Sequence, residues 1–169
     1  MPYVGSYTWK IRQKVGHDRL LMPTVDTLAV RDDGKILMVF NKDFNGWTFP
    51  GGQCELDKGW ADCALTELME EAGVVAEKSD LVPFTATSGN GWAFTYANGD
   101  SIQCFSMAFE VKKWRIVSEA LDDSEIAKRD FFSAEEIKKL QLSPSAGILL
   151  AAYEKYVETG EFQMTEVKS

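Results

Sequence analysis

Residues 47–74 read WTFPGGQCELDKGWADCALTELMEEAGV, and this stretch carries the strongest structural signal in the chain. Between Lys58 and Ala72 the apolar residues recur at helical spacing, which predicts a helix with one apolar face. That face is formed by Ala61, Ala64, Leu65, Leu68 and Ala72. Three carboxylates lie on the arc beside it, those of Glu67, Glu70 and Glu71. The stretch therefore predicts an amphipathic helix with an acidic stripe.

The acidic stripe has two explanations. Carboxylates at positions i, i+3 and i+4 repel one another, and the positions one turn away supply no lysine or arginine. A solvated polar face is the ordinary explanation for charges on a helix. A bound divalent cation is the alternative, because Mg²⁺ and Mn²⁺ prefer hard oxygen ligands. The turn at Pro50-Gly51-Gly52 favours the cation, since adjacent glycines allow backbone amides to approach a phosphate closely.

Strands and helices are mixed in the rest of the chain. Residues 24–41 predict a hairpin around a turn at 31–34, and residues 91–112 predict another around Asn98-Gly99. Further strands are expected at 47–49, ended by Pro50-Gly51-Gly52, at 80–86 and at 128–132. Further helices are expected from a capping box at 133–136 to Leu140, and from 143 to 157. The mixture predicts an α/β sandwich around a mixed sheet.

Composition narrows the class of protein. The 169 residues suit one ordinary domain, and the net charge of 18 − 26 = −8 argues against nucleic-acid polymers as partners. Three cysteines in no paired spacing argue against a disulfide framework. No stretch predicts a signal peptide or membrane span. We expect a cytoplasmic protein with an N-terminal extension over 1–22, one domain over 23–160 and a C-terminal tail over 161–169.

At this point the sequence resembles the Nudix (MutT-like) hydrolase family, whose signature is G-x5-E-x7-R-E-U-x-E-E-x-G-U, with U an aliphatic residue. Counted from Gly52, the chain matches the signature at Glu67, Leu68, Glu70, Glu71, Gly73 and Val74. It departs at two positions, with Lys58 in place of the first glutamate and Thr66 in place of the arginine. The resemblance implies an α/β/α sandwich.

The resemblance also implies a chemistry. Family members typically cleave a nucleoside diphosphate linked to another moiety by attack of water on phosphorus, with Mg²⁺ or Mn²⁺ as cofactor. Carried over by position, Glu67, Glu70 and Glu71 would hold the metal, together with a backbone carbonyl of Gly51 or, as we expect, Gly52. Glu67 and Glu70 are the expected catalytic residues, one of them accepting the proton of water. The expected partner is a small nucleotide, and family habit favours a homodimer.

The two departures leave the function open between three hypotheses. The family arginine orients a glutamate through a bidentate contact, which Thr66 cannot make, and Lys58 reverses the charge at its own position. In one hypothesis Lys58 replaces the missing positive charge and the chain is an active pyrophosphohydrolase. In another it is a nucleotide-binding module with weak or no catalysis. In the last it is a scaffold with an exposed acidic face.

Several other residues are interpreted as structural or solvated. For Glu125, in the loop Asp122-Asp123-Ser124-Glu125, a solvated acid is favoured over an additional base or metal ligand. The single histidine, His17, is interpreted as structural or exposed, and Cys54 and Cys63 near the acidic helix are given no chemical role. Four aromatic residues could stack on a base but are interpreted as packing residues: Trp92, Phe94, Tyr96 and Phe105. A basic cluster is interpreted as a solvated segment: Lys10, Arg12, Lys14 and Arg19.

Overall fold

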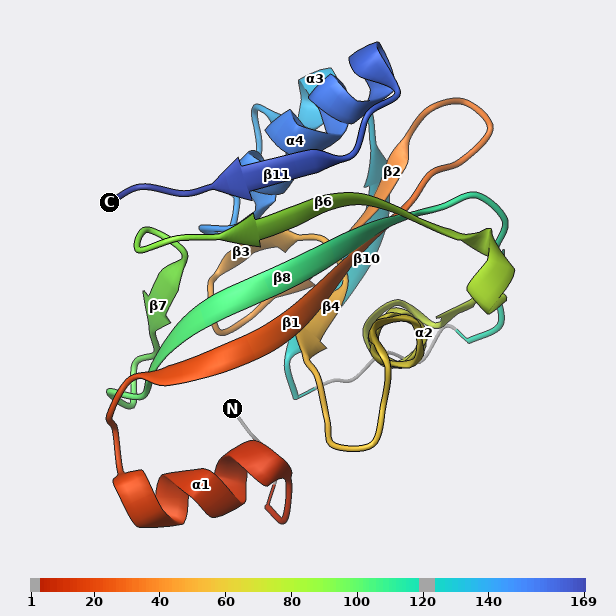
Figure 1. Cartoon of the computed structure of the whole chain (residues 1–169). Helices are drawn as coiled ribbons and strands as arrows, with labels where there is room; N and C mark the ends of the chain where they lie inside the picture. Colours follow the sequence, from red (N-terminus) through yellow and green to blue (C-terminus); the bar gives the residue numbers. More distant parts are fainter. Residues whose placement is uncertain (1–3, 119–123) are drawn as a thin grey trace.

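The fold is built around a six-stranded mixed sheet (Figure 1). The computed structural model describes residues 4–118 and 124–169. The strands of this sheet are β1 (Leu20–Ala29), β4 (Gly51–Gln53), β6 (Leu81–Ser88), β7 (Ala93–Thr95), β8 (Ser101–Val111) and β11 (Gln163–Glu166). Their order is β11-β6-β8-β1-β4, and β7 pairs with the end of β8. Strands β1 and β8 run parallel over ten residue pairs, and β11 runs parallel to β6, while the other pairs are antiparallel.

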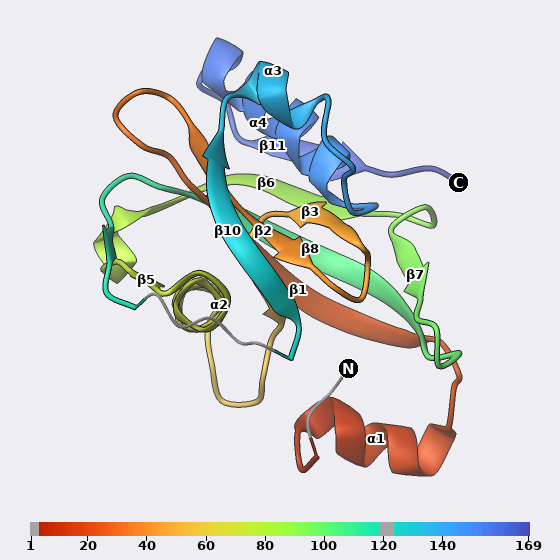
Figure 2. The same cartoon turned by 180° about the vertical axis from the view of Figure 1, so that it is seen from behind.

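A second, three-stranded sheet lies behind the first in Figure 1 and faces the viewer in Figure 2. It consists of β2 (Ile36–Asn41), β3 (Gly46–Thr48) and β10 (Ile126–Phe132), in the order β10-β2-β3. A short ladder joins β5 (Val74–Val75) to β9 (Arg115–Ile116), and a 3₁₀ turn occupies Lys78–Asp80. The predicted strands at 47–49, 80–86 and 128–132 are confirmed, with ends shifted by at most two residues.

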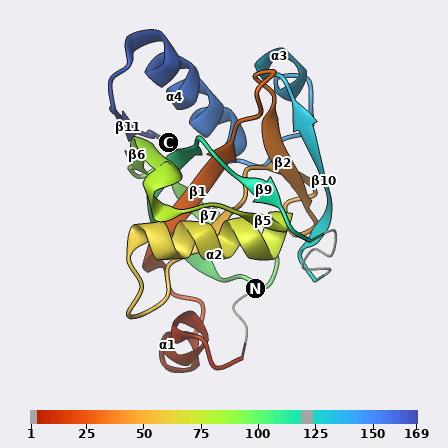
Figure 3. The same ribbon diagram turned by 90° about the vertical axis from the view of Figure 1, so that its right-hand side faces the viewer.

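The helices are α1 (Tyr7–Val15), α2 (Trp60–Ala72), α3 (Ala134–Ile137) and α4 (Ala146–Thr159). Helices α2 and α4 lie on opposite sides of the strands (Figure 3). One core cluster packs β1 and β2 against α2 through Val25, Val39, Ala64 and Leu68, and the other packs the sheets against α4 through Phe84 and Leu149. The predicted α/β sandwich is therefore confirmed. No helix in the described part of the chain is long and apolar enough to cross a membrane.

The acidic helix forms where the periodicity predicted it. Its apolar residues Ala64, Leu68 and Ala72 have no exposed surface. The helix ends at Gly73, which adopts a left-handed conformation with φ +62°. Arg129 of β10 donates a hydrogen bond to the carbonyl of Ala72 at that end. These contacts tie α2 to both sheets and fix the direction in which its acidic side faces.

Two predictions need correction, one about the pairing of two strands and one about a glycine turn. The turn at 31–34 closes as expected, with Arg31 N–H donating to the Lys35 carbonyl, but β1 and β2 then separate into different sheets. The reason is that the edges of β1 already pair with β8 and β4. Strand β3 ends at Thr48, just before Pro50, as predicted, but Gly51-Gly52 is not a turn: the two glycines belong to β4, opposite Asp26 and Val25 of β1. The hairpin around Asn98-Gly99 is confirmed as β7 and β8.

The remaining differences concern helix ends and elements that the patterns did not indicate. The capping box at Ser133 and Glu136 forms, but α3 stops at Ile137 instead of Leu140. Helix α4 begins at Ala146, after Pro144, and ends at Thr159, with Gly160 as its left-handed cap. Helix α1 was not predicted, and Tyr7, Trp9 and Ile11 alternate there with polar residues. Strand β11 was not predicted either, since its residues form a strand by pairing with the distant β6.

Candidate active site

An acidic cavity of about 320 Å³ opens beside β4 and the acidic side of α2. It is lined by segments that are far apart in the sequence, among them Ser6, Phe44, Tyr96 and Glu125. The predicted site residues Gly52, Glu67, Glu70 and Glu71 all line it. The fold thus brings the acidic stripe and the Gly51-Gly52 pair of β4 to one concave surface.

Glu71 is the most deeply buried carboxylate of the stripe, with 7% of its surface exposed. The backbone N–H of Gly51 donates a hydrogen bond of 2.8 Å to its Oε2, which orients the carboxylate toward β4. Burial, followed by repulsion from Glu67, raises the pKa of Glu71 well above its ordinary value. Such a carboxylate is costly to ionise unless a cation lies beside it.

Glu67 lies against the next glycine of the same strand. A Cβ at Gly52 would stand 2.6 Å from Oε1 of Glu67, so the carboxylate occupies the space that any other residue at 52 would need. The side chain is half-buried, and burial together with the charge of Glu70 raises the pKa of Glu67 to about 7. The charge of Lys58 opposes this shift. Glu70 is exposed and lies at the open side of the cavity.

Asp26 is a buried acid that the sequence analysis missed. It lies on β1 directly opposite Gly51, and its carboxylate is 9% exposed. Burial raises the pKa of Asp26 to about 7, and its charge in turn raises the pKa values of Glu67 and Glu71. A signal was present in the sequence, since Asp26 is the only acid within the apolar run at 24–30.

Glu125 lines the cavity as well, and its negative charge raises the pKa values of Glu67 and Glu71. The favoured interpretation of Glu125 as a plain solvated loop acid therefore needs correction, because this residue faces the acidic stripe. Asp122 and Asp123 lie outside the described residues.

The donor set of the cavity fits a hard divalent cation. Within residues 4–118 and 124–169, no three His, Cys, Asp or Glu side chains already converge tightly enough to form a metal centre. The observations that favour a cation are the two carboxylates with raised pKa, Glu67 and Glu71, and the close approach of the Gly51-Gly52 backbone to both. A cation bound by oxygen ligands would relieve the repulsion between these acids. Burial raises the pKa of the Cys54 thiol to about 12, which disfavours its thiolate as a ligand.

The N-terminal end of helix α1 lies at the cavity. Ser6, whose side chain caps the helix at Trp9 N–H, lines the cavity itself. In the first turn of the helix, Thr8 Oγ1 donates a hydrogen bond of 2.8 Å to Oε1 of Gln53, a residue of β4 that also lines the cavity. The N-terminal extension therefore contributes to the site through contacts that the sequence did not indicate.

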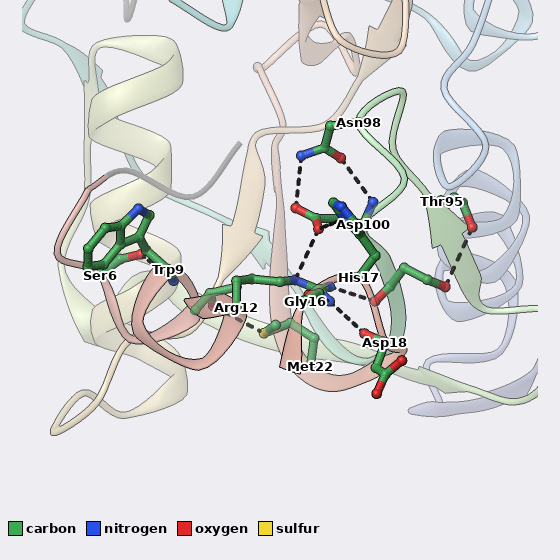
Figure 4. A network of polar contacts seen from close by, with 12 residues as sticks. Ser6, Trp9, Arg12, Gly16, His17, Asp18, Met22, Thr95, Asn98 and Asp100 are labelled. Carbon is green, nitrogen blue, oxygen red and sulfur yellow. Dashed lines mark hydrogen bonds and ion pairs between the residues drawn. The ribbon is translucent and has the colours of Figure 1, made fainter. Parts of the chain in front are cut away.

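A polar network holds α1 in this place (Figure 4). Arg12 is 8% exposed, donates hydrogen bonds to the carbonyls of Gly16, Asp18 and Ser101, and pairs with Asp100 at 3.5 Å. The interpretation of Arg12 as part of a solvated basic cluster was therefore wrong, because its guanidinium is buried among carbonyl oxygens. His17 is exposed and contacts Asp100 through Nδ1 at 2.8 Å, which confirms the structural interpretation of this residue.

The aromatic residues divide into packing and lining roles. Trp92 is buried and donates through Nε1 to Ser106 at 2.9 Å, so its packing role is confirmed. Phe105 is exposed. Tyr96 lines the cavity next to Phe44, with ring centroids 6.1 Å apart. Tyr96 and Phe44 thus form an aromatic part of the cavity lining.

Comparison with known proteins gives a consistent assignment. The family model described as NUDIX domain matches residues 20–153. A search among curated proteins gave no match. Among solved structures, a MutT NUDIX hydrolase from Burkholderia pseudomallei shares 17% identity with a TM-score of 0.64, covering 79% of this chain and 98% of its own. An ADP-ribose pyrophosphatase from Streptococcus suis 89-1591 shares 19% identity with a TM-score of 0.56, and the match covers 86% of this chain and 98% of that one.

A third structure is a bifunctional NMN adenylyltransferase/ADP ribose pyrophosphatase from Francisella tularensis, in complex with AMP and a Mn ion. It shares 22% identity and a TM-score of 0.59, covering 88% of this chain and 45% of that one. All three likenesses concern the fold, and the family match covers most of the chain.

Proposed function

The chain belongs to the NUDIX domain family and is a Nudix-type hydrolase, and we propose that it hydrolyses a nucleoside diphosphate linked to another moiety, with Mg²⁺ or Mn²⁺ as cofactor. Divalent metals are general in this family. The printed description of the Francisella neighbour, a complex with AMP and a Mn ion, supports a nucleotide and a cation of this kind. The small nucleotide is then the partner of the site, and the expected homodimer stays a prediction.

The single observation that carries this proposal is the convergence of Glu67 and Glu71 on the two glycines of β4. Gly51 N–H donates to Glu71, and Glu67 fills the space beside Gly52. The two acids are thereby held at a backbone that presents no side chain of its own. The carboxylate oxygens of both acids therefore lie against the β4 backbone, where they and a backbone carbonyl form one group of hard oxygen ligands for a cation.

Each proposed role belongs to a residue of this chain. Glu67, Glu70 and Glu71 would hold the metal, and the backbone carbonyl of Gly52 would complete the set of oxygen ligands. When bound, the metal would neutralise phosphate charge and lower the pKa of a water molecule. Glu67 and Glu70 are the proposed catalytic residues, and one of them accepts the proton of the attacking water. The half-buried position of Glu67 suits proton transfer near neutral pH.

The test is hydrolysis of a nucleotide panel, comprising nucleoside diphosphate sugars, dinucleoside polyphosphates and nucleoside triphosphates, with and without Mg²⁺ or Mn²⁺. Glu70→Gln removes one proposed ligand, and Glu158→Gln, at an exposed position of α4, is the matched control. We expect metal-dependent turnover that Glu70→Gln lowers by at least about a hundredfold and that Glu158→Gln leaves unchanged. Turnover that does not depend on metal, or that survives Glu70→Gln, would overturn the proposal.

The alternative function, a nucleotide-binding module with weak or no catalysis, is favoured by one specific observation. The arginine and glutamate of the family signature are both replaced, by Thr66 and Lys58. This alternative predicts that the panel is not hydrolysed, while a nucleotide still binds in the presence of metal and raises the melting temperature. The same panel therefore separates the two functions.

A further inference from the structure

The charge balance of the cavity is strongly negative. In the described ranges, six carboxylates line it, those of Asp43, Glu55, Glu67, Glu70, Glu71 and Glu125. Lys58 is the one cationic side chain lining it in the same ranges. A polyphosphate that enters this cavity meets carboxylates on most sides and a single ammonium group. Among the described residues that line the cavity, Lys58 is therefore the one whose side chain can form an ion pair with a phosphate.

The Lys58 ammonium is held on the helix side of the cavity. Its Nζ donates to Oγ1 of Thr66 at 3.4 Å, and Thr66 Oγ1 donates its own proton to the carbonyl of Asp62 at 2.9 Å. A threonine hydroxyl has one proton and two lone pairs, so the bond to Asp62 leaves a lone pair for the lysine. The threonine thus fixes the ammonium one residue before Glu67 on the helix.

Two of the three N–H groups of the Lys58 ammonium have no protein acceptor among the described residues, because only the contact with Thr66 is made. The side chain is exposed and borders two hollows, the acidic cavity and an apolar groove that contains Leu56 and Trp60. The free donors are therefore accessible from the space in which a substrate would lie. Lysine binds phosphate as a compact point charge with several donors.

From these contacts we propose that Lys58, anchored by Thr66, is a substrate-binding residue whose ammonium pairs with a phosphate of the bound diphosphate. The inference rests on the proposed function, because it places a diphosphate in the acidic cavity. It also explains both departures from the family signature together. The positive charge lies at Lys58 instead of at position 66, and Thr66 accepts a hydrogen bond from the Lys58 ammonium.

The test uses the full chain with Mn²⁺ and methylenediphosphonate, a diphosphate analogue that cannot be hydrolysed, in isothermal titration calorimetry. We expect Lys58→Gln to weaken binding of the analogue by about tenfold or more, the factor that one charge-assisted contact supplies, and Lys58→Arg to restore most of it. Thr66→Val, which keeps the shape but removes the acceptor, is expected to weaken binding by about threefold. Binding of Mn²⁺ alone should stay within about threefold of wild type in Lys58→Gln, because Lys58 is not a metal ligand.

Steady-state kinetics with a hydrolysed nucleotide complete the test. Lys58→Gln should raise KM more than it lowers kcat, as expected for a contact made before and during the reaction. Unchanged analogue binding and KM in Lys58→Gln would overturn the inference. If wild type binds the analogue through Lys58 but hydrolyses nothing, the proposed hydrolysis fails while the inference stands. If wild type turns over and Lys58→Gln equals it, the inference alone fails.

Discussion

The carboxylate of Glu67 lies in the space that a side chain at Gly52 would occupy, with Oε1 only 2.6 Å from where a Cβ would stand. The neighbouring Gly51 is constrained differently, because a Cβ there would stand 2.3 Å from the backbone carbonyl of Val25. One glycine therefore makes room for a functional side chain, and the other makes room for the pairing of β1 with β4.

This difference predicts that an alanine at position 52 mainly impairs turnover, while an alanine at position 51 mainly impairs stability. Gly52→Ala pushes aside the flexible end of Glu67 and should reduce turnover by at least about tenfold, while changing the free energy of unfolding by less than about 1 kcal/mol. Gly51→Ala meets rigid backbone and should lower the free energy of unfolding by about 2 kcal/mol. Urea denaturation and nucleotide hydrolysis measure the two effects. A larger loss of stability in Gly52→Ala than in Gly51→Ala would contradict the assignment.

Asp26 predicts a pH-dependent stability. Its pKa rises from 3.8 to about 7 on folding, because burial disfavours the charged form. Below pH 3.8 Asp26 is protonated in both the folded and the unfolded chain, and between pH 3.8 and about 7 it has lost its proton only in the unfolded chain. Stability is therefore lost as pH rises through this window, and the loss is complete above about pH 7. Asp26→Asn removes the cost and should stabilise the metal-free protein by roughly 2–4 kcal/mol at about pH 8, with little effect near pH 4. Urea denaturation at both values checks the sign, and an equal effect at both would contradict it.

Protonation of Glu67 should compete with metal binding. Its pKa of about 7 in the metal-free protein means that the carboxylate must lose a proton before it can ligate a cation below neutral pH. Mn²⁺ should therefore raise the melting temperature more at about pH 8 than at about pH 6, with apparent affinity falling about tenfold per pH unit below the pKa. Glu67→Gln should remove the stabilisation at both values. A shift of the same size at both pH values in wild type would refute this role of Glu67.

The Arg12–Asp100 pair predicts how α1 is attached. Both side chains are buried, and Arg12 also donates to three backbone carbonyls. Arg12→Met leaves Asp100 without its cation and these carbonyls without their donor, so it should destabilise the protein by about 2–4 kcal/mol. Lys14→Met, at an exposed position of the same helix, is the control. Hydrogen exchange should show earlier opening of residues 7–15 in Arg12→Met, and protection equal to wild type would exclude a tethering role.

The contact between positions 58 and 66 predicts a rescue by charge exchange. Lys58→Glu should lower kcat/KM because it adds a seventh carboxylate to the cavity and removes its cation. Thr66→Arg places a guanidinium beside the Lys58 ammonium and should also be harmful. The double variant restores the glutamate and arginine of the family signature, and its kcat/KM should exceed that of Lys58→Glu by about tenfold or more. Strictly additive losses in this double-mutant cycle would show that the two positions are not coupled.

Features that depend on local spacing could be predicted from the residues alone. Helix α2 could be predicted because its apolar residues recur at the helical period, and that same period placed Glu67, Glu70 and Glu71 side by side. The turn of β7 and β8 was predictable from Asn98-Gly99, and the family resemblance followed from residues at fixed offsets from Gly52. In each case the physical cause lies within a few residues of the signal.

The surroundings of the acidic stripe depend on long-range packing and could not be predicted in this way. Asp26, Glu125, Tyr96 and Ser6 come to its surroundings from separate parts of the chain, and the charges of Glu125 and Asp26 raise the pKa of Glu67. Strand pairing, which decided that Gly51-Gly52 joins β1, depends on partners distant in the chain. The contact of Lys58 with Thr66 depends on how the loop before α2 folds back onto the helix. Residue spacing cannot predict such contacts, because they arise from the packing of whole elements against one another.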